Sequence, residues 1–175
     1  MTEEAKITFL VFTYNEESRV EFMLRCIQGH GEIVVIDNYS KDKTLEIASK
    51  YTNNLYTYKN PGYIENESTM AFALSRVKTK WVYLTYVDEL IPKELLKQLI
   101  ELSNQDQYKI VKVYRKDFMF GQEVFNYGKH HLRMFIPGTV DFKNNIVHKL
   151  GRGLVPENEI FKIKASDRTS IWHFS

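Results

Sequence analysis

The stretch WVYLTYVDEL, residues 81–90, is an apolar run that ends abruptly in two adjacent carboxylates, Asp88 and Glu89. Its aromatic and β-branched residues follow no helical period, which is typical of a buried strand. Acidic groups at the end of a buried strand raise the question of what they bind. The neighbouring segments of the chain supply the context for an answer.

Strand and helix patterns alternate through the first part of the chain. KITFLVFT (6–13), EIVVID (32–37) and NLYTYK (54–59) are further strand candidates. SKDKTLEIASKY (40–51) supplies capping residues followed by a helix, and Pro92 opens another helix. Apolar residues at helical spacing mark the remaining helices: Val20, Met23, Leu24, Ile27, Met70, Ala73, Leu74 and Val77. This alternation over about 100 residues predicts an α/β fold with a mostly parallel central sheet and helices on both faces.

The pattern changes after residue 105, where strand candidates are separated by loops rich in Gly and Asn. The candidates are YKIVKVYRKDFMF (108–120), HHLRMFI (130–136), EIFKIKA (159–165) and TSIWHFS (169–175). No linker or repeat separates the two parts, and 175 residues lie within the usual domain size of about 100–200 residues. We therefore expect a single domain, 1–175, with a βα half (1–105) and a β-rich half (106–175).

Composition narrows the class of protein. The single cysteine excludes an internal disulfide and fits a reducing compartment. The acidic N-terminus MTEEAK does not resemble a signal peptide, and no apolar run reaches the ~18 residues of a membrane span. A net charge of +2, mixed along the chain, gives no reason to expect a nucleic-acid partner. We expect a cytoplasmic protein whose basic residues, denser after residue 109, allow peripheral association with an anionic membrane surface.

Polar residues follow three of the predicted strands, at the edge where ligands bind in open α/β sheets. They are TYNE (13–16), DNYS (37–40) and DE (88–89). Each group alone has a second interpretation as a helix cap or turn. Gly-rich phosphate-binding loops are missing from the sequence, which argues against dinucleotide and P-loop binding. Acidic strand ends without such loops suit a ligand whose phosphates are met by Mg²⁺ or Mn²⁺; Asp88 could hold the cation, and Asp37 could accept hydrogen bonds from a nucleobase.

Three segments resemble the family 2 glycosyltransferases of the GT-A (nucleotide-diphospho-sugar transferase) fold. They are ITFLVFTYNEE (7–17), IVVIDNYSKDKT (33–44) and WVYLTYVDEL (81–90). The tail, with FMFG (118–121), HHLRMF (130–135), NIVHKL (145–150) and IWHFS (171–175), resembles small bacterial members that act on lipopolysaccharide core or related surface glycans. The resemblance implies transfer of a sugar from a nucleotide-diphosphate sugar to a glycan or lipid-linked glycan hydroxyl, inverting and dependent on Mn²⁺ or Mg²⁺, in polysaccharide biosynthesis at the inner face of the membrane.

The resemblance also implies roles for individual residues. Asp88 would be the metal-binding member of the Asp-x-Asp motif, and Arg133 and His148 would lie close to the diphosphate or the metal, with His148 as a metal ligand. Asp88, Glu89 and Arg133 would form the catalytic set, with Glu89, Glu123 and Asp141 as candidates for the general base. The nucleotide-sugar donor would be bound by Thr13, Tyr14, Asn15, Glu16, Asp37 and Ser40.

The sequence departs from the family pattern at two positions. Tyr86 stands where the motif has its first aspartate, and Lys149 stands where a glutamate usually follows the tail histidine. The main alternative is therefore a catalytically impaired binding module that retains the nucleotide-sugar site. A nucleotidyltransferase would need a Gly-rich basic loop in place of Tyr14-Asn15-Glu16, and a receiver domain would need an acidic cluster after the first strand.

Overall fold

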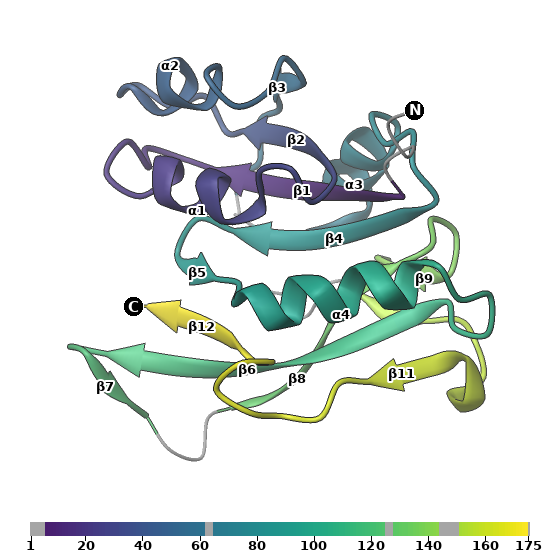
Figure 1. The fold of residues 1–175 in the computed structure, drawn as a ribbon. Coiled ribbons are helices and arrows are strands. Elements are labelled where there is room, and N and C mark those ends of the chain that lie inside the picture. The colour runs from purple at the N-terminus through teal and green to yellow at the C-terminus, as the bar shows by residue number, and fades with distance from the viewer. Residues whose placement is uncertain (1–5, 62–64, 125–127, 144–150, 175) are drawn as a thin grey trace.

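The computed structural model describes residues 6–61, 65–124, 128–143 and 151–174, and it confirms the α/β fold (Figure 1). The strands of the first half are β1 (Ile7–Thr13), β2 (Glu32–Asp37), β3 (Leu55–Thr57), β4 (Trp81–Tyr86) and β5 (Glu89–Leu90). Its helices are α1 (Val20–Ile27), α2 (Thr44–Ala48), α3 (Glu67–Leu74) and α4 (Lys93–Ser103). Each strand and helix predicted up to residue 105 is present, while β5 was not foreseen.

The regular elements described after residue 105 are strands and one short 3-10 turn, as the sequence pattern predicted. The strands are β6 (Ile110–Met119), β7 (Gln122–Glu123), β8 (Lys129–Phe135), β9 (Val140–Asp141), β10 (Arg152–Gly153), β11 (Ile160–Lys162) and β12 (Ile171–Phe174). A 3-10 turn spans Glu157–Glu159. The four strand candidates after residue 105 thus became β6, β8, β11 and β12.

One sheet joins the two halves. Its strand order is β3-β2-β1-β4-β8-β6-β12-β5, with β7 and β11 paired to β6. The first four strands in this order are parallel, and β8 pairs antiparallel with both β4 and β6. Because β4 and β8 are neighbours, the β-rich half extends the sheet of the βα half.

Two apolar layers bury the faces of the sheet. Helices α1, α2 and α4 cover one face, where Phe9, Tyr83 and Leu99 are completely buried. Helix α3 covers the other face, where Met70 and Ala73 pack against Leu10 and Leu84. Successive side chains of a strand point to opposite faces of the sheet, so each strand contributes side chains to both apolar layers. This arrangement fixes the carboxyl ends of β1, β2 and β4 beside one another at one edge.

Strand β12 occupies a position that the sequence did not reveal. It pairs parallel with β6 and antiparallel with the short β5, which places His173 opposite Glu89. Figure 1 shows the C-terminal strand (yellow) ending near β5, on the same side as the carboxyl end of β4. None of the helices in the described parts of the chain is long and apolar enough to cross a membrane.

Candidate active site

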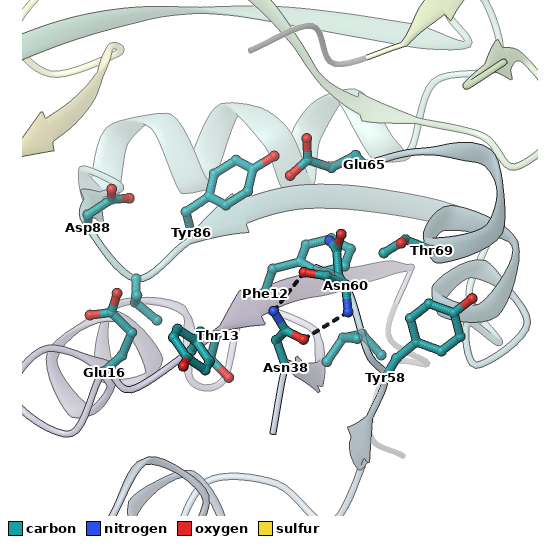
Figure 2. A pocket seen from close by; sticks show the side chains of 13 residues that line it. Phe12, Thr13, Glu16, Asn38, Tyr58, Asn60, Glu65, Thr69, Tyr86 and Asp88 are labelled. Carbon is teal, nitrogen blue, oxygen red and sulfur yellow. Dashed lines mark hydrogen bonds between the residues drawn. The ribbon is translucent and has the colours of Figure 1, made fainter. Parts of the chain in front are cut away.

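A cavity of about 310 Å³ opens where β1, β2 and β4 end. Figure 2 shows its side chains pointing inward from the ends of these strands, from the segment after β3 and from the start of α3. The lining residues are Phe12, Thr13, Tyr14, Glu16, Ile36, Asn38, Tyr58, Asn60, Glu65, Thr69, Tyr86, Val87 and Asp88. Apolar and aromatic walls with a few polar groups are typical of a small-molecule site.

Asp88 is held by a series of contacts with charged and titratable side chains outside the cavity lining. His173 Nε2 lies 3.2 Å from Asp88 Oδ2, and His173 Nδ1 lies 2.9 Å from Asp117 Oδ1. Arg115 Nη2 lies 2.9 Å from the same Asp117 oxygen. Asp88 Oδ1 is buried and has no hydrogen-bond partner on another residue. One oxygen of Asp88 is thus held by His173, while the other is enclosed and makes no hydrogen bond to another residue.

The contact between Asp88 and His173 changes the pKa of both groups. Burial acts to raise the pKa of Asp88, but the hydrogen bond and charge of His173, together with Arg19, hold this pKa below its ordinary value. The hydrogen bond to Asp88 raises the pKa of His173, against the opposing effect of burial. Asp88 is therefore a carboxylate at neutral pH, with a histidine that favours the cationic form beside it.

The loops after β1 and β2 are joined by hydrogen bonds that the Asp37 carboxylate accepts. Asp37 is completely buried and accepts hydrogen bonds from Thr13 Oγ1 at 2.9 Å and from the backbone N–H of Ser40 at 2.8 Å. Asn15, whose φ of 52° is left-handed, accepts a hydrogen bond from the Lys41 backbone N–H at 2.8 Å. Such φ values cost free energy in a non-glycine residue and persist where neighbours enforce them. These contacts hold the two loops as one rim of the cavity.

Asn38, the residue after Asp37, fixes the opposite wall. Its amide accepts a hydrogen bond from the Asn60 backbone N–H and donates one to the Asn60 carbonyl, both at 2.8 Å. This pair, drawn as dashed lines in Figure 2, ties the segment after β3 to the end of β2. Tyr58 lies on the same wall and stacks on Phe72 with ring centroids 4.5 Å apart. The wall is therefore aromatic and rigidly connected to the sheet.

Tyr86 lies between the two acidic ends of the cavity. In Figure 2 its ring stands between Asp88 and Glu65, with the hydroxyl directed toward Glu65. Burial, followed by the charge of Glu65, raises the Tyr86 pKa well above its ordinary value. The Tyr86 phenol is therefore neutral at physiological pH.

Arg133 and Glu89 lie behind this surface and form a buried ion pair. Both side chains are 0% exposed. The Arg133 guanidinium also donates to the Leu84 carbonyl at 3.3 Å and lies 5.2 Å from the centroid of the Tyr86 ring. Burial raises the pKa of Glu89 even though Arg133 opposes this effect. The pair contacts the back of Tyr86 but does not line the cavity.

The structure brings only part of the predicted site together at the cavity. Asp88, Thr13, Tyr14 and Glu16 line it, whereas the other predicted donor and catalytic residues are not part of its lining: Asn15, Asp37, Ser40, Glu89 and Arg133. The placement of Arg133 differs from the expectation that it approaches the diphosphate, because Glu89 attracts the guanidinium into the core. Predictions for His148 and Lys149 lie outside the described residues.

The other two candidates for the general base are also remote from the cavity lining. Glu123 pairs with Lys116 at 3.1 Å, and Asp141 lies 3.4 Å from Arg152. The cavity carboxylates are Glu16, Glu65 and Asp88. Of these, Glu16 is bound by Arg19 through two contacts of 2.8 and 2.9 Å.

Sequence reasoning predicted neither Glu65 nor His173 as a site residue. Glu65 follows no strand pattern, so only three-dimensional packing reveals that it lies beside Tyr86 at the cavity. His173 had a usable signal, because it lies in an apolar strand candidate. What the pattern did not show was the pairing of that strand with β5, which brings the imidazole to Asp88.

Comparison with known proteins identifies the class to which this fold and site belong. The sequence profile described as Glycosyl transferase family 2 matches residues 8–165. The chain therefore belongs to glycosyl transferase family 2, a family of glycosyl-transferring enzymes, and the predicted resemblance is confirmed.

Particular relatives agree with this assignment. An uncharacterised glycosyltransferase of Rickettsia typhi is 30% identical over 121 residues, which are 64% of this chain and 40% of that protein. The structure of S. aureus TarS 1-349 in complex with UDP-GlcNAc matches with a TM-score of 0.54 and 26% identity, over 68% of this chain and 36% of TarS 1-349. The mannosyltransferase PcManGT from Pyrobaculum calidifontis, in complex with GDP-Man and Mn²⁺, matches with a TM-score of 0.52 and 19% identity, over 77% and 45% of the respective chains. The chain thus spans less than half the length of these proteins, and the last match concerns the fold alone.

Proposed function

We propose that this chain binds a nucleotide-diphosphate sugar in the cavity and transfers the sugar to a hydroxyl of a glycan or lipid-linked glycan. The observation that carries the proposal is the position of Asp88 at the end of β4, with one buried oxygen that has no partner on another residue. It faces a cavity with aromatic walls in a member of glycosyl transferase family 2. TarS was solved with UDP-GlcNAc, which supports a sugar nucleotide as the ligand here.

The nucleoside occupies the aromatic part of the cavity, and the diphosphate lies toward Asp88. Phe12 and Tyr58 offer flat apolar surfaces on the nucleoside side, and Thr13 and Tyr14 contribute hydroxyl groups beside them. Asn15, Asp37 and Ser40 act from behind by holding the loops that carry these residues. Their contribution to donor binding is therefore one of position, since none of the three lines the cavity.

Asp88 suits a divalent cation. Mg²⁺ and Mn²⁺ prefer oxygen ligands and bind through one or two carboxylates together with substrate phosphates. Asp88 provides such a carboxylate at the cavity, and His173 restrains it through Oδ2. When bound, the cation would neutralise charge on the departing diphosphate. His148, predicted as a second ligand, remains a prediction.

The reaction proposed is a single displacement with inversion at the anomeric carbon. A bond forms from the acceptor oxygen to that carbon while the bond to the diphosphate oxygen breaks, and the electron pair leaves with the nucleoside diphosphate. The acceptor proton passes to a base. Glu89 and Arg133 serve this reaction as positioning residues, because their buried pair supports Tyr86 at the cavity wall. We further propose that transfer to a lipid-linked acceptor takes place at the cytoplasmic face of a membrane.

Binding and turnover of sugar nucleotides test the proposal directly. UDP and GDP and their sugars are titrated against wild type and Asp88→Asn, with and without Mn²⁺, and release of nucleoside diphosphate is followed with each sugar. We expect one nucleotide to bind with Mn²⁺, and Asp88→Asn to lose the metal-dependent part of the affinity and the turnover. Asp106→Asn is the matched control, because Asp106 is exposed and does not line the cavity. An Asp88→Asn protein with unchanged metal dependence would remove Asp88 from the mechanism.

A second candidate function is nucleotide-sugar binding without transfer. The observation that favours it is Tyr86, which puts a neutral phenol where the family motif has an acidic residue. This candidate predicts the same ligand binding but no release of nucleoside diphosphate with any acceptor.

A further inference from the structure

Aromatic side chains of β6 and β12 lie together on one face of the sheet, and none of them lines the cavity. The centroid of the Phe118 ring lies 5.3 Å from that of Trp172 and 5.4 Å from that of Phe174, at interplanar angles of 34° and 28°. Phe174 is 39% exposed, and the other two residues are partly exposed. Exposed apolar side chains that lie together mark binding surfaces. We call these three residues the aromatic strip.

Backbone pairing and a hydrogen bond hold the aromatic strip in place. The register between β12 and β6 sets Phe174 beside Phe118 and Trp172 beside Lys116. The Trp172 indole N–H also donates to the Asp167 carbonyl at 3.1 Å. A surface that is already ordered loses little conformational entropy when a ligand binds. The strip is therefore prepared for a partner before the partner arrives.

The aromatic strip reaches the Asp88 end of the candidate site. The Phe174 backbone N–H donates to the Asp88 carbonyl at 2.9 Å. Successive side chains of a strand point to opposite faces, so His173 contacts the Asp88 carboxylate from one face of β12 and the strip occupies the other. Figure 1 places the end of β12 and the hairpin of β6 and β7 at the same end of the sheet. A molecule on the strip would therefore lie beside the site.

Charges around the aromatic strip favour a neutral ligand over an anionic membrane. Lys116 Nζ lies 3.1 Å from Glu123 Oε2 and 2.5 Å from Asp167 Oδ1, and Glu123 lies opposite Phe118 in the sheet. These three charged groups sum to one negative charge, and the neighbouring Arg168 brings the sum to zero. Anionic membranes attract clusters of unneutralised Lys and Arg. A sugar fits better, because its C–H groups pack against aromatic rings and its hydroxyls bind carboxylates and ammonium groups.

We propose that the aromatic strip binds sugar residues of the acceptor glycan. The inference rests on the proposed function, because that function supplies a glycan as acceptor. Phe118, Trp172 and Phe174 contribute affinity and orientation, and they hold no reacting atom. Strand β12 then has two roles, since its other face carries the histidine that holds Asp88.

The two tryptophans of the chain make binding visible at a single residue. Trp172 belongs to the strip, whereas Trp81 is 0% exposed and donates its indole N–H to the Ser103 carbonyl. NMR of ¹⁵N-labelled protein therefore gives one indole signal that reports on the strip and one that serves as an internal reference. The probes are the methyl glycosides of glucose, galactose, mannose and N-acetylglucosamine. We expect at least one of them to shift the Trp172 signal in a saturable way and to leave that of Trp81 unchanged.

Phe174→Leu tests the aromatic ring, because leucine keeps an apolar side chain but removes the π-face. An aromatic contact corresponds to about two- to tenfold in affinity, so we expect the dissociation constant of the glycoside to rise by about that factor. Phe120→Leu is the matched control, because Phe120 is 96% exposed at the turn after β6 and is not one of the three stacked rings. Its dissociation constant should stay within about twofold of wild type. Equal affinities in wild type and Phe174→Leu, or no Trp172 shift with any probe, would overturn the inference.

Two further measurements identify other partners of the aromatic strip. Wild type and Phe174→Leu are sedimented with vesicles of phosphatidylethanolamine and phosphatidylglycerol, and their oligomeric states are measured by analytical ultracentrifugation. Vesicle binding or a dimer that Phe174→Leu abolishes would assign the strip to lipid or to a second copy of the chain, and would overturn the inference.

Titration with UDP and GDP in the presence of Mn²⁺ tests the proposed function separately. A protein that binds a nucleotide but shows no glycoside effect at Trp172 would retain the proposed function and lose the inference. A protein that binds glycosides on the strip but neither nucleotide would lose the proposed function, and with it the assignment of the bound sugar as an acceptor.

Discussion

The buried pair of Arg133 and Glu89 predicts a large loss of stability when only one partner is removed. Arg133→Met keeps an apolar stem of similar length but leaves Glu89, whose side chain is 0% exposed, without its cation. Breaking a buried pair in this way costs about 3–5 kcal/mol. The substitution also removes the hydrogen bond to the Leu84 carbonyl and the contact with the Tyr86 ring, which place the expected value in the upper part of that range.

This cost is measurable by thermal and urea unfolding at neutral pH. For a domain of about 150–250 residues, 1 kcal/mol corresponds to about 2–4 °C in Tm, so we expect Arg133→Met to lower Tm by about 6–20 °C. Replacing both residues, as Arg133→Met with Glu89→Gln, leaves no buried charge and should recover at least about 2 kcal/mol relative to the single variant. Such a recovery would show that the single variant loses stability because of the uncompensated Glu89 charge and not because of lost packing.

An exposed ion pair provides the comparison. Lys80 and Asp106 lie 2.6 Å apart, but their side chains are 44% and 94% exposed, and exposed pairs contribute about 0–1 kcal/mol. Lys80→Met should therefore change Tm by no more than about 4 °C. The reasoning would be refuted if Arg133→Met lowered Tm no more than Lys80→Met does. It would also be refuted if the double variant lost as much free energy of unfolding as Arg133→Met and Glu89→Gln lose together as single variants.

Three further predictions concern other parts of the structure. His173→Gln should destabilise the protein more near pH 6 than near pH 9. The raised pKa of His173 gives a stabilisation that is present below its ordinary pKa of about 6.5 and is lost as the pH rises through the raised pKa, while the stabilisation from the lowered pKa of Asp88 is lost only in acid. Equal losses at both pH values in urea unfolding would contradict this prediction. Asp37→Asn should cost about 1–3 kcal/mol, because the amide turns a donor toward buried donors, and an unchanged urea midpoint would refute this. Gly31→Ala should cost at least about 1–3 kcal/mol, because a Cβ there would meet the Ile7 carbonyl at 2.4 Å; calorimetric unfolding with no loss of Tm would show that the backbone adapts.

Periodicity predicted most of the fold because burial in this chain follows the pattern of its apolar residues. The helix expected from Val20, Met23, Leu24 and Ile27 buries those four side chains. The strands that end before the cavity are likewise nearly continuous apolar runs, as expected for strands covered on both faces. Pairing in the β-rich half was not predictable, because strand patterns specify which face is buried but not which neighbour is chosen.

The lining of the cavity was predictable only where it follows a strand end. Asp88, Thr13 and Glu16 were predicted in this way, and each lines the cavity. Arg133 shows the limit of the approach, since a sequence does not reveal whether an arginine meets a ligand or a buried glutamate. Glu65 shows the complementary limit, because its relation to Tyr86 depends on how α3 is set against the sheet.

The place of β12 has a consequence for the order in which the molecule is completed during folding. The cavity walls belong to residues up to Asp88, and the βα half that carries them consists of local, parallel units. β12 must instead enter between β6 and β5, with the Phe174 N–H donating to the Asp88 carbonyl at 2.9 Å. Contacts between residues so distant in sequence form slowly. We expect pulse-labelled hydrogen exchange to protect β1 and β4 before β12. A nascent chain would then form the cavity before His173 of β12 reaches Asp88.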